Sequence, residues 1–347
     1  MYAEHLRRRG HQVVAVSLPG RPVELHRQIK SLVKGRGWQR ANRPDTTHFD
    51  KIDIEHRIID SHRPIEDRDL PDADVVIATW WETAEWVARL SASKGAKAYL
   101  IQQLESNFSG MPAERVEATW RLPMQKIVVS RWLADLARDR FGDPDAIVTP
   151  NGIDLDLFNA PVRGRQPRPT VGLLYVPTVP NKGTRTALSV IEAASRRVPG
   201  LHVRAFGTEP QHPEAPLPPG SDYFQLPPQD SIREIYAGCD VWLCTSTSEG
   251  YHLPPHEAMA CRCPVVSTRV GGPMDQIIDG VNGYLLDVND VDGLTERLVS
   301  VLQLPDPAWR RLSDAAHDSV KDFTWDKATM LLERALEAAI ERSSRTA

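Results

Sequence analysis

Short apolar runs alternate along this chain with amphipathic stretches of helical spacing. Such runs, bounded by turn-forming residues, are typical of strands buried on both faces of a parallel sheet. Strands that alternate with helices indicate doubly wound α/β sheets of the Rossmann-like kind. We expect strands at residues 13–17, 53–60, 73–79, 97–103, 126–130 and 146–150, and then at 171–176, 201–208, 223–226, 241–244, 264–268 and 284–288.

Helices are expected between these strands and after the last one. Their predicted positions are 2–9, 131–141, 181–194, 229–238, 291–302 and 327–341, and two more begin at Pro254–Pro255 and at Pro273. Residues 159–170 are rich in proline and arginine, which favours a linker. The chain of 347 residues is long enough for two domains. We therefore predict domains at residues 1–158 and 159–324.

The stretch 240–283 reads strand, loop, helix, strand, loop, helix. Each loop carries glycine, and each helix opens at proline, which suits a first helical turn. Helix N-termini at the carboxyl ends of parallel strands present unpaired N–H groups and a positive dipole end. The pattern therefore predicts an anion site that suits a diphosphate.

Two carboxylates, Glu249 and Glu257, flank this predicted anion site. Because a phosphate repels a carboxylate, we expect these acids to face neutral hydroxyls. An ionised carboxylate offers two acceptor oxygens and matches the vicinal diol of a ribose or a hexose. Amides on a diphosphate and acids on diols describe a nucleotide sugar. The alternative is that both acids are solvated residues favoured by the helix dipole.

The segment SEGYHLPPHEAMAC, with seven residues between Glu249 and Glu257, is followed by PVVSTRVGG and DGVNGYLL. This sequence resembles the retaining GT-B glycosyltransferases of family 4 (glycosyl transferases group 1), and the resemblance runs from about Gly10 to the C-terminus. It implies a GT-B fold with two Rossmann-like domains, an interdomain cleft and a final helix, residues 325–343, that packs back on the N-terminal domain. The implied reaction transfers a hexosyl unit from a nucleoside-diphosphate sugar to a hydroxyl of a glycan, lipid-linked or small-molecule acceptor, without a metal or other cofactor.

The resemblance also implies roles for single residues. Glu249 contacts sugar hydroxyls and orients the donor, Lys182 offsets the charge of the leaving diphosphate, and Glu257 holds the ribose diol. The family's arginine near Lys182 is absent, so Arg185 or Arg269 is expected to replace its charge. The remaining donor-site candidates are Gly250, His252, Leu253, Gly271 and Gly272, and the acceptor-side candidates are Trp80, Trp81 and Gln103.

Some positions depart from the family pattern or have a second interpretation. His252 and Arg262 stand where relatives often have glycine, so we expect strain at Arg262 if its φ is positive. Trp80 and Trp81 suit sugar stacking or core packing equally well. Asp154-Leu155-Asp156 has the form of a metal-binding DxD motif, but it matches the family's hinge segment better.

The beginning of the sequence lacks an expected element. In the family, a first strand and a glycine-rich loop precede the helix and strand that correspond to residues 2–9 and 13–17. We expect the first strand of the N-terminal domain to be missing here, and we favour a truncated sequence over a trimmed chain or a rearranged domain.

Composition narrows the function further. A net charge of −4 and a pI of about 6.3 do not favour nucleic acid binding by the whole chain. The four cysteines read as buried free thiols, which fits a cytoplasmic protein. Basic residues crowd the first fifty positions, as on a solvated surface or on a face that contacts the inner side of a membrane. They are Arg7, Arg8, Arg9, Arg21, Arg27, Lys30, Lys34, Arg36, Arg40 and Arg43.

Other function classes stay open at this point. A nucleotide-sugar epimerase of the same fold would need no acceptor. A catalytically weak sugar-nucleotide-binding subunit would fit the missing strand and the lost arginine. A nicotinamide dehydrogenase is disfavoured because no GxGxxG motif follows a strand.

Overall fold

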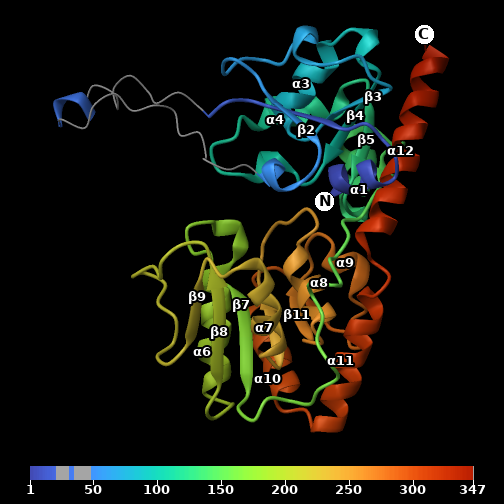
Figure 1. Cartoon of the computed structure of the whole chain (residues 1–347). Helices are drawn as coiled ribbons and strands as arrows, with labels where there is room; N and C mark the ends of the chain where they lie inside the picture. The colour runs from blue at the N-terminus through green and yellow to red at the C-terminus, as the bar shows by residue number, and fades with distance from the viewer. Residues whose placement is uncertain (21–30, 35–47, 347) are drawn as a thin grey trace. The chain divides into compact units, whose positions relative to one another are not determined.

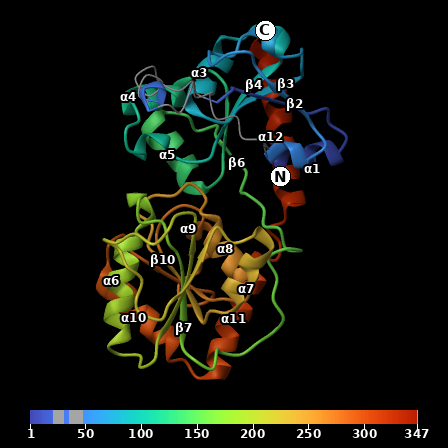
Figure 2. The ribbon, with the colours of Figure 1, turned by 60° about the vertical axis from the view of Figure 1, so that its left-hand side comes forward.

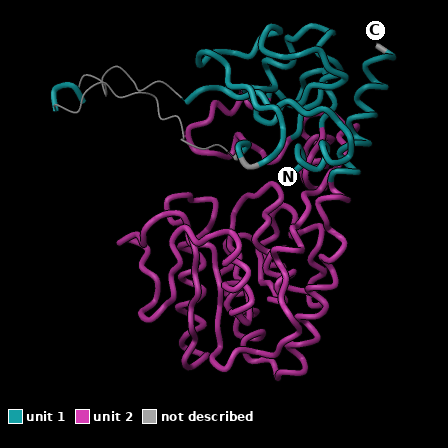
Figure 3. The backbone as a smooth tube through the Cα atoms, in the orientation of Figure 1, with its two compact units in different colours: residues 1–100, 118–126, 329–347 teal, residues 101–117, 127–328 magenta. Residues whose placement is uncertain are grey.

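The computed structural model describes residues 1–20, 31–34 and 48–346. The chain divides into two compact units, which Figure 3 colours separately. Unit 1 comprises residues 1–100, 118–126 and 329–347, and unit 2 comprises residues 101–117 and 127–328. The predicted domain limits at residues 158 and 324 stay a prediction. Several of the basic residues noted above, Arg21, Arg27, Lys30, Arg36, Arg40 and Arg43, lie outside the described residues.

Unit 2 is built on a six-stranded sheet in the order β12-β11-β10-β7-β8-β9. All neighbouring strands are parallel. The central strands are buried on both faces, which explains their continuous apolar runs. The strands are β7 (Thr170–Leu174), β8 (His202–Gly207), β9 (Asp222–Gln225), β10 (Val241–Cys244), β11 (Val265–Thr268) and β12 (Tyr284–Leu286).

Helices cover both faces of this sheet (Figures 1 and 2). On one face lie α6 (Thr184–Ser195) and α10 (Val291–Leu302), and on the other lie α7 (Ile232–Ala237), α8 (Leu253–Ala260) and α11 (Asp306–Val320). Each face has its own hydrophobic core. Val190, Ile191 and Leu298 belong to the first, and Tyr236, Trp242 and Met259 belong to the second.

The N-terminal strands form two separate sheets. β1 (Val14–Ser17) pairs with β2 (Glu55–Ile58), and a four-stranded sheet has the order β3-β4-β5-β6. Its strands are β3 (Val75–Ala78), β4 (Ala96–Ile101), β5 (Gln125–Val128) and β6 (Ile147–Val148). The helices of this part are α1 (Tyr2–Arg8), α3 (Trp81–Arg89), α4 (Ala113–Ala118) and α5 (Arg131–Phe141). Among the described residues no strand joins β1 to β3.

The final helix, α12 (Trp325–Thr346), belongs to unit 1 from Thr329 onward. Its residue Glu333 accepts hydrogen bonds from Arg9, whose Nε lies 2.9 Å away, and pairs with His11 at 2.6 Å. These contacts tie the helix to the chain just before β1.

The predicted elements correspond closely to those of the structure. The bounds of β10, α5 and α10 agree with the predictions to the residue. The fold class is confirmed as parallel α/β, with a doubly wound sheet in unit 2. The prediction missed α11, although Pro305 precedes it and its buried Trp309, Leu312, Ala316 and Val320 have helical spacing.

Arg262 has the left-handed backbone conformation that its position after α8 suggested. Its φ is +58°, which costs a residue with a Cβ about 1 kcal/mol. Its side chain also makes contacts: Nε donates to the Ala160 carbonyl at 3.1 Å and Nη1 to Asp314 at 2.6 Å. The strain and the contacts therefore act in opposite directions on stability.

We predict that Arg262→Gly is more stable than Arg262→Ala by about 1 kcal/mol, because both variants lose the side-chain contacts and only glycine relieves the strain. Urea unfolding of the two variants measures the difference. The matched control is Arg334, exposed within α12, where alanine should be the more stable of the two by about the same amount. The same order of stability at both positions would contradict the strain.

Candidate functional site

The strand order of unit 2 predicts where a ligand binds. β7 and β10 are neighbours, yet the chain runs from β7 outward to β8 and from β10 outward to β11 on the other side. Loops that leave such a pair in opposite directions separate at the carboxyl ends of the strands and form a crevice. The loops after β7, β10 and β11 carry Lys182, Glu249 and Gly271, respectively.

The loops after β7 and β10 are joined by close backbone contacts. The Thr245 hydroxyl donates to the Gly183 carbonyl at 2.8 Å, and the Thr247 N–H donates to the Asn181 carbonyl at the same distance. Gly183 has a φ of +67°, and a Cβ there would lie 1.9 Å from the Thr245 carbonyl oxygen. Only glycine fits this point, which fixes the position of the adjacent Lys182.

Lys182 and Glu249 form a largely buried ion pair. The Lys182 Nζ lies 2.8 and 3.0 Å from the two carboxylate oxygens, and the Ser246 hydroxyl donates to one of them at 2.8 Å. The Glu249 side chain is 5% exposed and that of Lys182 is 28% exposed. Burial acts to raise the pKa of Glu249. The attraction of His252, which is charged only at acid pH, the charge of Lys182 and the hydrogen bonds outweigh it, so the pKa is lowered. Glu249 is therefore an ionised acid, and one face of its partner remains accessible.

His252 lies beside this pair as a neutral group. Burial lowers its pKa to about 4, so at neutral pH the ammonium of Lys182 is the positive charge next to Glu249. The His252 Nε2 lies 3.8 Å from a Glu249 oxygen, which is too far for a hydrogen bond. Its Nδ1 is buried and has no hydrogen-bond partner within the described ranges. The residue has a φ of +69°, which lies in the left-handed region.

The helix N-termini offer fewer amide donors than the sequence pattern suggested. Leu253 begins α8, but Pro254 and Pro255 follow it and have no N–H. The second helix, α9 (Pro273–Gln276), is a single turn, and the N–H of Asp275 already donates to the Gly272 carbonyl at 2.8 Å. These two N-termini therefore offer few free amides, and Lys182 is the main cationic feature at these loops.

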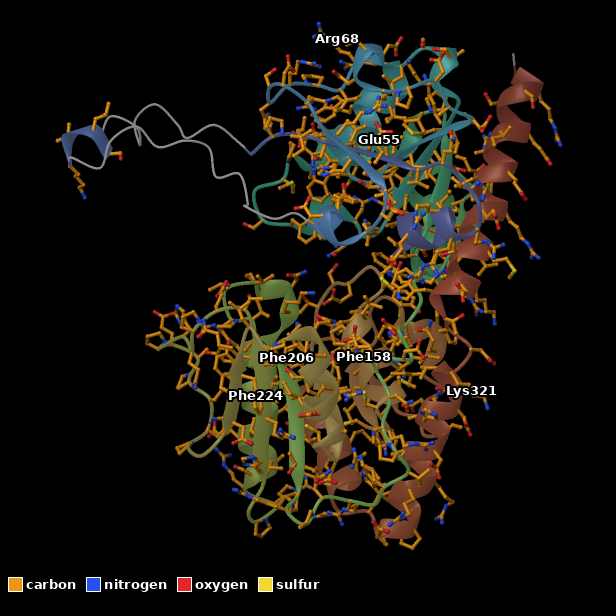
Figure 4. The ribbon with its side chains drawn as sticks, viewed as in Figure 1. Glu55, Arg68, Phe158, Phe206, Phe224 and Lys321 are labelled. Atoms are coloured by element: carbon orange, nitrogen blue, oxygen red, sulfur yellow. The ribbon has the colours of Figure 1, made fainter. Side chains whose placement is uncertain are left out.

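Glu257 lies one turn into α8 and has a different environment. Its Oε2 accepts a hydrogen bond from the Tyr236 hydroxyl at 2.8 Å, and burial raises its pKa to about 7. Tyr236 is fully buried among Trp242, Phe206 and Phe158, with ring centroids 4.6, 5.8 and 6.1 Å away. Figure 4 labels Phe206 and Phe158 within unit 2. The sequence predicted Glu257 but not Tyr236, whose only signal is its place in the predicted helix 229–238.

The predicted glycines approach other segments of the chain closely. A Cβ on Gly250 would lie 1.6 Å from the Gln102 carbonyl oxygen, and one on Gly272 would lie 2.4 Å from that of Tyr251. The Gly250 carbonyl accepts hydrogen bonds from the Ser130 hydroxyl at 2.9 Å and the Trp132 Nε1 at 3.0 Å. The segment of Gln103 therefore lies next to the loop of Glu249, and both segments belong to unit 2.

Of the remaining candidates, Arg185 and Arg269 contact other residues, whereas Gly271 lies against Glu249: a Cβ on Gly271 would be 3.1 Å from the Glu249 Cβ. Arg185 is exposed and donates to the Glu214 carbonyl at 2.9 Å, while Arg269 is exposed and pairs with Asp287 at 3.5 Å. Gly271 has a φ of +57° in the loop after β11, and Gln103 has a buried Nε2 without a partner among the described residues. In unit 1, Trp81 is in the core and Trp80 is partly buried, and the Thr83 hydroxyl accepts from the Trp80 N–H at 3.0 Å.

The described residues contain no group of three or more His, Cys, Asp or Glu side chains placed to hold a metal ion. Within the DxD sequence, Asp154 accepts from the Leu157 N–H at 3.1 Å, as in an ordinary turn. All four cysteines are free and buried in the second core of unit 2, as predicted. No helix among the described residues has the length and apolar character needed to cross a membrane.

Part of this chain is similar in sequence to a known protein family and to curated proteins. Residues 170–304 match the family described as Glycosyl transferases group 1. An uncharacterized glycosyltransferase of Methanocaldococcus jannaschii is 31% identical over 108 residues, 31% of this chain and 30% of that protein. A D-inositol 3-phosphate glycosyltransferase of Mycobacterium avium is 30% identical over 216 residues, 57% of this chain and 50% of that protein. The chain thus spans half or less of the length of these curated relatives.

Solved structures support the fold over nearly the whole chain. A sucrose-phosphate synthase from Thermosynechococcus elongatus has a TM-score of 0.70 at 19% identity, covering 97% of this chain and 92% of that one. The Anabaena protein HepE in complex with UDP-glucose also has a TM-score of 0.70, at 15% identity, covering 94% of this chain and 99% of that one. The fold is therefore that of the GT-B glycosyltransferases.

We predict opposite pH dependences of stability for His252 and Glu257. The folded pKa of His252, about 4, lies below its ordinary 6.5, so its contribution is present above pH 6.5 and is lost as the pH falls. The folded pKa of Glu257, about 7, lies above its ordinary 4.5, so its contribution is present below pH 4.5 and is lost as the pH rises.

Between pH 4.5 and 6.5, therefore, the free energy of unfolding of Glu257→Gln should rise more steeply with pH than that of the wild type. That of His252→Asn should rise less steeply; asparagine is chosen because it tolerates a positive φ. Each slope should differ from the wild-type slope by about 1 kcal/mol per pH unit. Urea midpoints across this range measure both slopes. Parallel curves for wild type and the two variants would contradict the assignment.

Proposed function

We propose, from the premise that residues 170–304 form a domain of the glycosyl transferases group 1 family, that this chain is a retaining glycosyltransferase. It transfers a hexosyl unit from a nucleoside-diphosphate sugar to a hydroxyl of a glycan, lipid-linked or small-molecule acceptor. The acceptor oxygen forms a bond to the anomeric carbon, the bond from that carbon to the diphosphate oxygen breaks, and the hydroxyl proton leaves with the diphosphate.

The observation that carries the proposal is the Lys182–Glu249 pair at the carboxyl ends of β7 and β10. It presents a partly accessible ammonium and an ionised carboxylate at the switch point of a parallel sheet. An ammonium suits the oxygens of a diphosphate, and a carboxylate suits sugar hydroxyls. The buried Nδ1 of His252 adds a polar atom without a partner beside them.

In this proposal the donor lies on unit 2. Lys182 contacts the diphosphate and stabilises the charge that develops on it, while Glu249 accepts from sugar hydroxyls and orients the donor. His252 faces the diphosphate or the sugar, and Glu257 accepts from the ribose diol. The loop residues Gly250, Leu253, Gly271 and Gly272 shape the site by their backbone, and Arg185 and Arg269 supply long-range positive charge. No metal is required, because Lys182 and the backbone dipoles provide the positive potential.

The acceptor is proposed to meet residues of the N-terminal part. Trp80 is the better of the two tryptophans for contact with a sugar face, because Trp81 is buried in the core of unit 1. Gln103 contributes an amide from the segment that adjoins Gly250. HepE was crystallised with UDP-glucose, which makes UDP-glucose a reasonable first donor to test. We also propose that the protein is located in the cytoplasm and makes peripheral contact with the inner face of the membrane.

We predict that binding of the nucleotide sugar strengthens as the pH rises. Both hydroxyls of a diol can donate hydrogen bonds to an ionised carboxylate, but a protonated acid has only one oxygen free to accept. The nucleotide sugar therefore binds the ionised form of Glu257, whose pKa in the free chain is about 7. Calorimetry should give a Kd about tenfold lower at pH 8 than at pH 6, with a proton released on binding.

The matched variant for this experiment is Glu257→Gln, which should bind the donor more weakly and with a Kd that does not change over the same pH range. A wild-type Kd independent of pH, or a variant that retains the wild-type pH dependence, would remove Glu257 from the ribose site.

A second prediction concerns Lys182. Lys182→Met should weaken binding of UDP and UDP-glucose by roughly 10- to 100-fold, the effect of a lost charge-assisted hydrogen bond. Arg196→Met, which removes an exposed charge from the far end of α6, the helix that follows Lys182, should have little effect. Because Lys182→Met leaves the buried Glu249 carboxylate without its countercharge, the double variant Lys182→Met/Glu249→Gln should regain stability but not affinity.

Assays of the reaction separate this function from the two alternatives. Incubation with the donor alone, followed by NMR, should leave the sugar configuration unchanged, whereas an epimerase would invert one centre. Donor with an acceptor should give a product of retained anomeric configuration. Tight donor binding without transfer to any acceptor tested would instead favour a binding subunit. Thermal shift with a set of nucleotide sugars identifies the donor, because a ligand that binds the native state raises the Tm.

A further inference from the structure

The ion pair of the free chain joins two side chains that a nucleotide sugar would contact at different places. In the proposed function, on which this inference rests, Lys182 contacts the diphosphate and Glu249 contacts the sugar. In the structure the two groups bind each other, with the Lys182 Nζ 2.8 and 3.0 Å from the Glu249 Oε1 and Oε2. An ammonium has three N–H groups, so a diphosphate that reaches Lys182 competes with the carboxylate for them.

Glu249 depends on Lys182 for its countercharge. The Glu249 side chain is 5% exposed, so water screens its charge little. Within the described part of the chain, the Ser246 hydroxyl at 2.8 Å is the other hydrogen-bond donor to this carboxylate. His252 is neutral near pH 7, because burial lowers its pKa to about 4. A ligand that draws Lys182 away therefore leaves a buried anion with one neutral donor, which is unfavourable.

The two arginines of the neighbouring segments do not replace Lys182 at this carboxylate. Arg185 donates to the Glu214 carbonyl at 2.9 Å, and Arg269 pairs with Asp287 at 3.5 Å. Both arginine side chains are exposed to solvent. A diphosphate therefore meets a cation and an anion whose charges cancel, and the anion repels it strongly because the site excludes water.

A sugar attached to the diphosphate changes this balance. The first sugar ring is bonded directly to the terminal phosphate, so its hydroxyls lie within reach of a carboxylate beside the phosphate-binding ammonium. Hydroxyls that donate to Glu249 take over the hydrogen bonds that Lys182 gives up. A nucleoside diphosphate without a sugar has no group at that end that can do so.

We propose that the Lys182–Glu249 pair makes the site discriminate against a nucleoside diphosphate that carries no sugar. Binding of the nucleotide sugar exchanges the pair, since Lys182 turns to the diphosphate and Glu249 accepts from the sugar hydroxyls in its place. After the sugar has been transferred and the glycosylated acceptor has left, Glu249 regains Lys182 and the diphosphate is released. The ion pair thus favours release of the product.

The variant Glu249→Gln tests this exchange, because it keeps the shape of the side chain and frees Lys182. Calorimetry with the full chain should give a Kd for UDP about tenfold lower than in the wild type, the effect of one regained charge-assisted hydrogen bond. Inorganic pyrophosphate, which has neither base nor sugar, should follow UDP. The Kd for UDP-glucose should stay the same or rise, because the sugar hydroxyls lose their charged acceptor.

Two further variants serve as controls. Glu192→Gln breaks an exposed ion pair with Arg196 within α6, and it should change none of these Kd values by more than about twofold. In Lys182→Met/Glu249→Gln the gain in affinity for UDP should disappear, because no ammonium is left to bind it. A cooperative urea transition of each variant shows that the variant is folded.

Three results would overturn the exchange. They are a UDP Kd that does not fall in Glu249→Gln, a UDP-glucose Kd that falls by the same factor as that of UDP, and a gain for UDP that persists without Lys182. The proposed function survives each of them if the wild type still binds UDP-glucose and transfers glucose. A wild-type chain that binds none of the three ligands would remove the proposed donor site and the exchange together.

Discussion

Parallel pairing is the constraint from which the site of this protein follows. A parallel strand must be followed by a crossover, so all loops that leave the carboxyl ends meet at one edge of the sheet. In unit 2 the chain turns outward from β7 in one direction and from β10 in the other, and their loops meet as Lys182 and Glu249. The glycine at 183 permits the close contact with Thr245 that sets this geometry. The chemistry of the site is therefore a result of the topology as much as of the residues.

The ion pair at this edge is costly to bury and is stabilised by what surrounds it. Burying a carboxylate costs several kcal/mol unless charge and hydrogen bonds compensate. Glu249 receives both, from Lys182 and from the Ser246 hydroxyl. A neutral His252 beside the pair avoids a second buried cation. This arrangement keeps the Glu249 carboxylate ionised in a buried site, where its hydrogen bonds to a ligand would be stronger than in water.

The sequence predicted those features that depend on local pattern. Apolar runs and proline or glycine boundaries were enough for β10, α5 and α10, and the motif around Glu249 pointed to the loops that carry the Lys182–Glu249 pair. Features set by tertiary contact were not predicted. Tyr236 reaches Glu257 only because α7 and α8 pack on the same face, and Arg185 turns to Glu214 instead of the site. Pro254 and Pro255, which suit the first turn of α8, also reduce the number of amides that this N-terminus can offer a ligand.

The burial of the four thiols has a practical consequence for work on this protein. Cys239, Cys244, Cys261 and Cys263 share one hydrophobic core, and burial raises the pKa of each thiol, to about 12 for Cys239. Almost no thiolate forms at neutral pH, and the thiolate is the reactive species. Alkylating reagents therefore modify the native chain only when that core opens. The rate at which the native cysteines are labelled therefore measures the rate of local unfolding around β10 and α8, without any engineered probe.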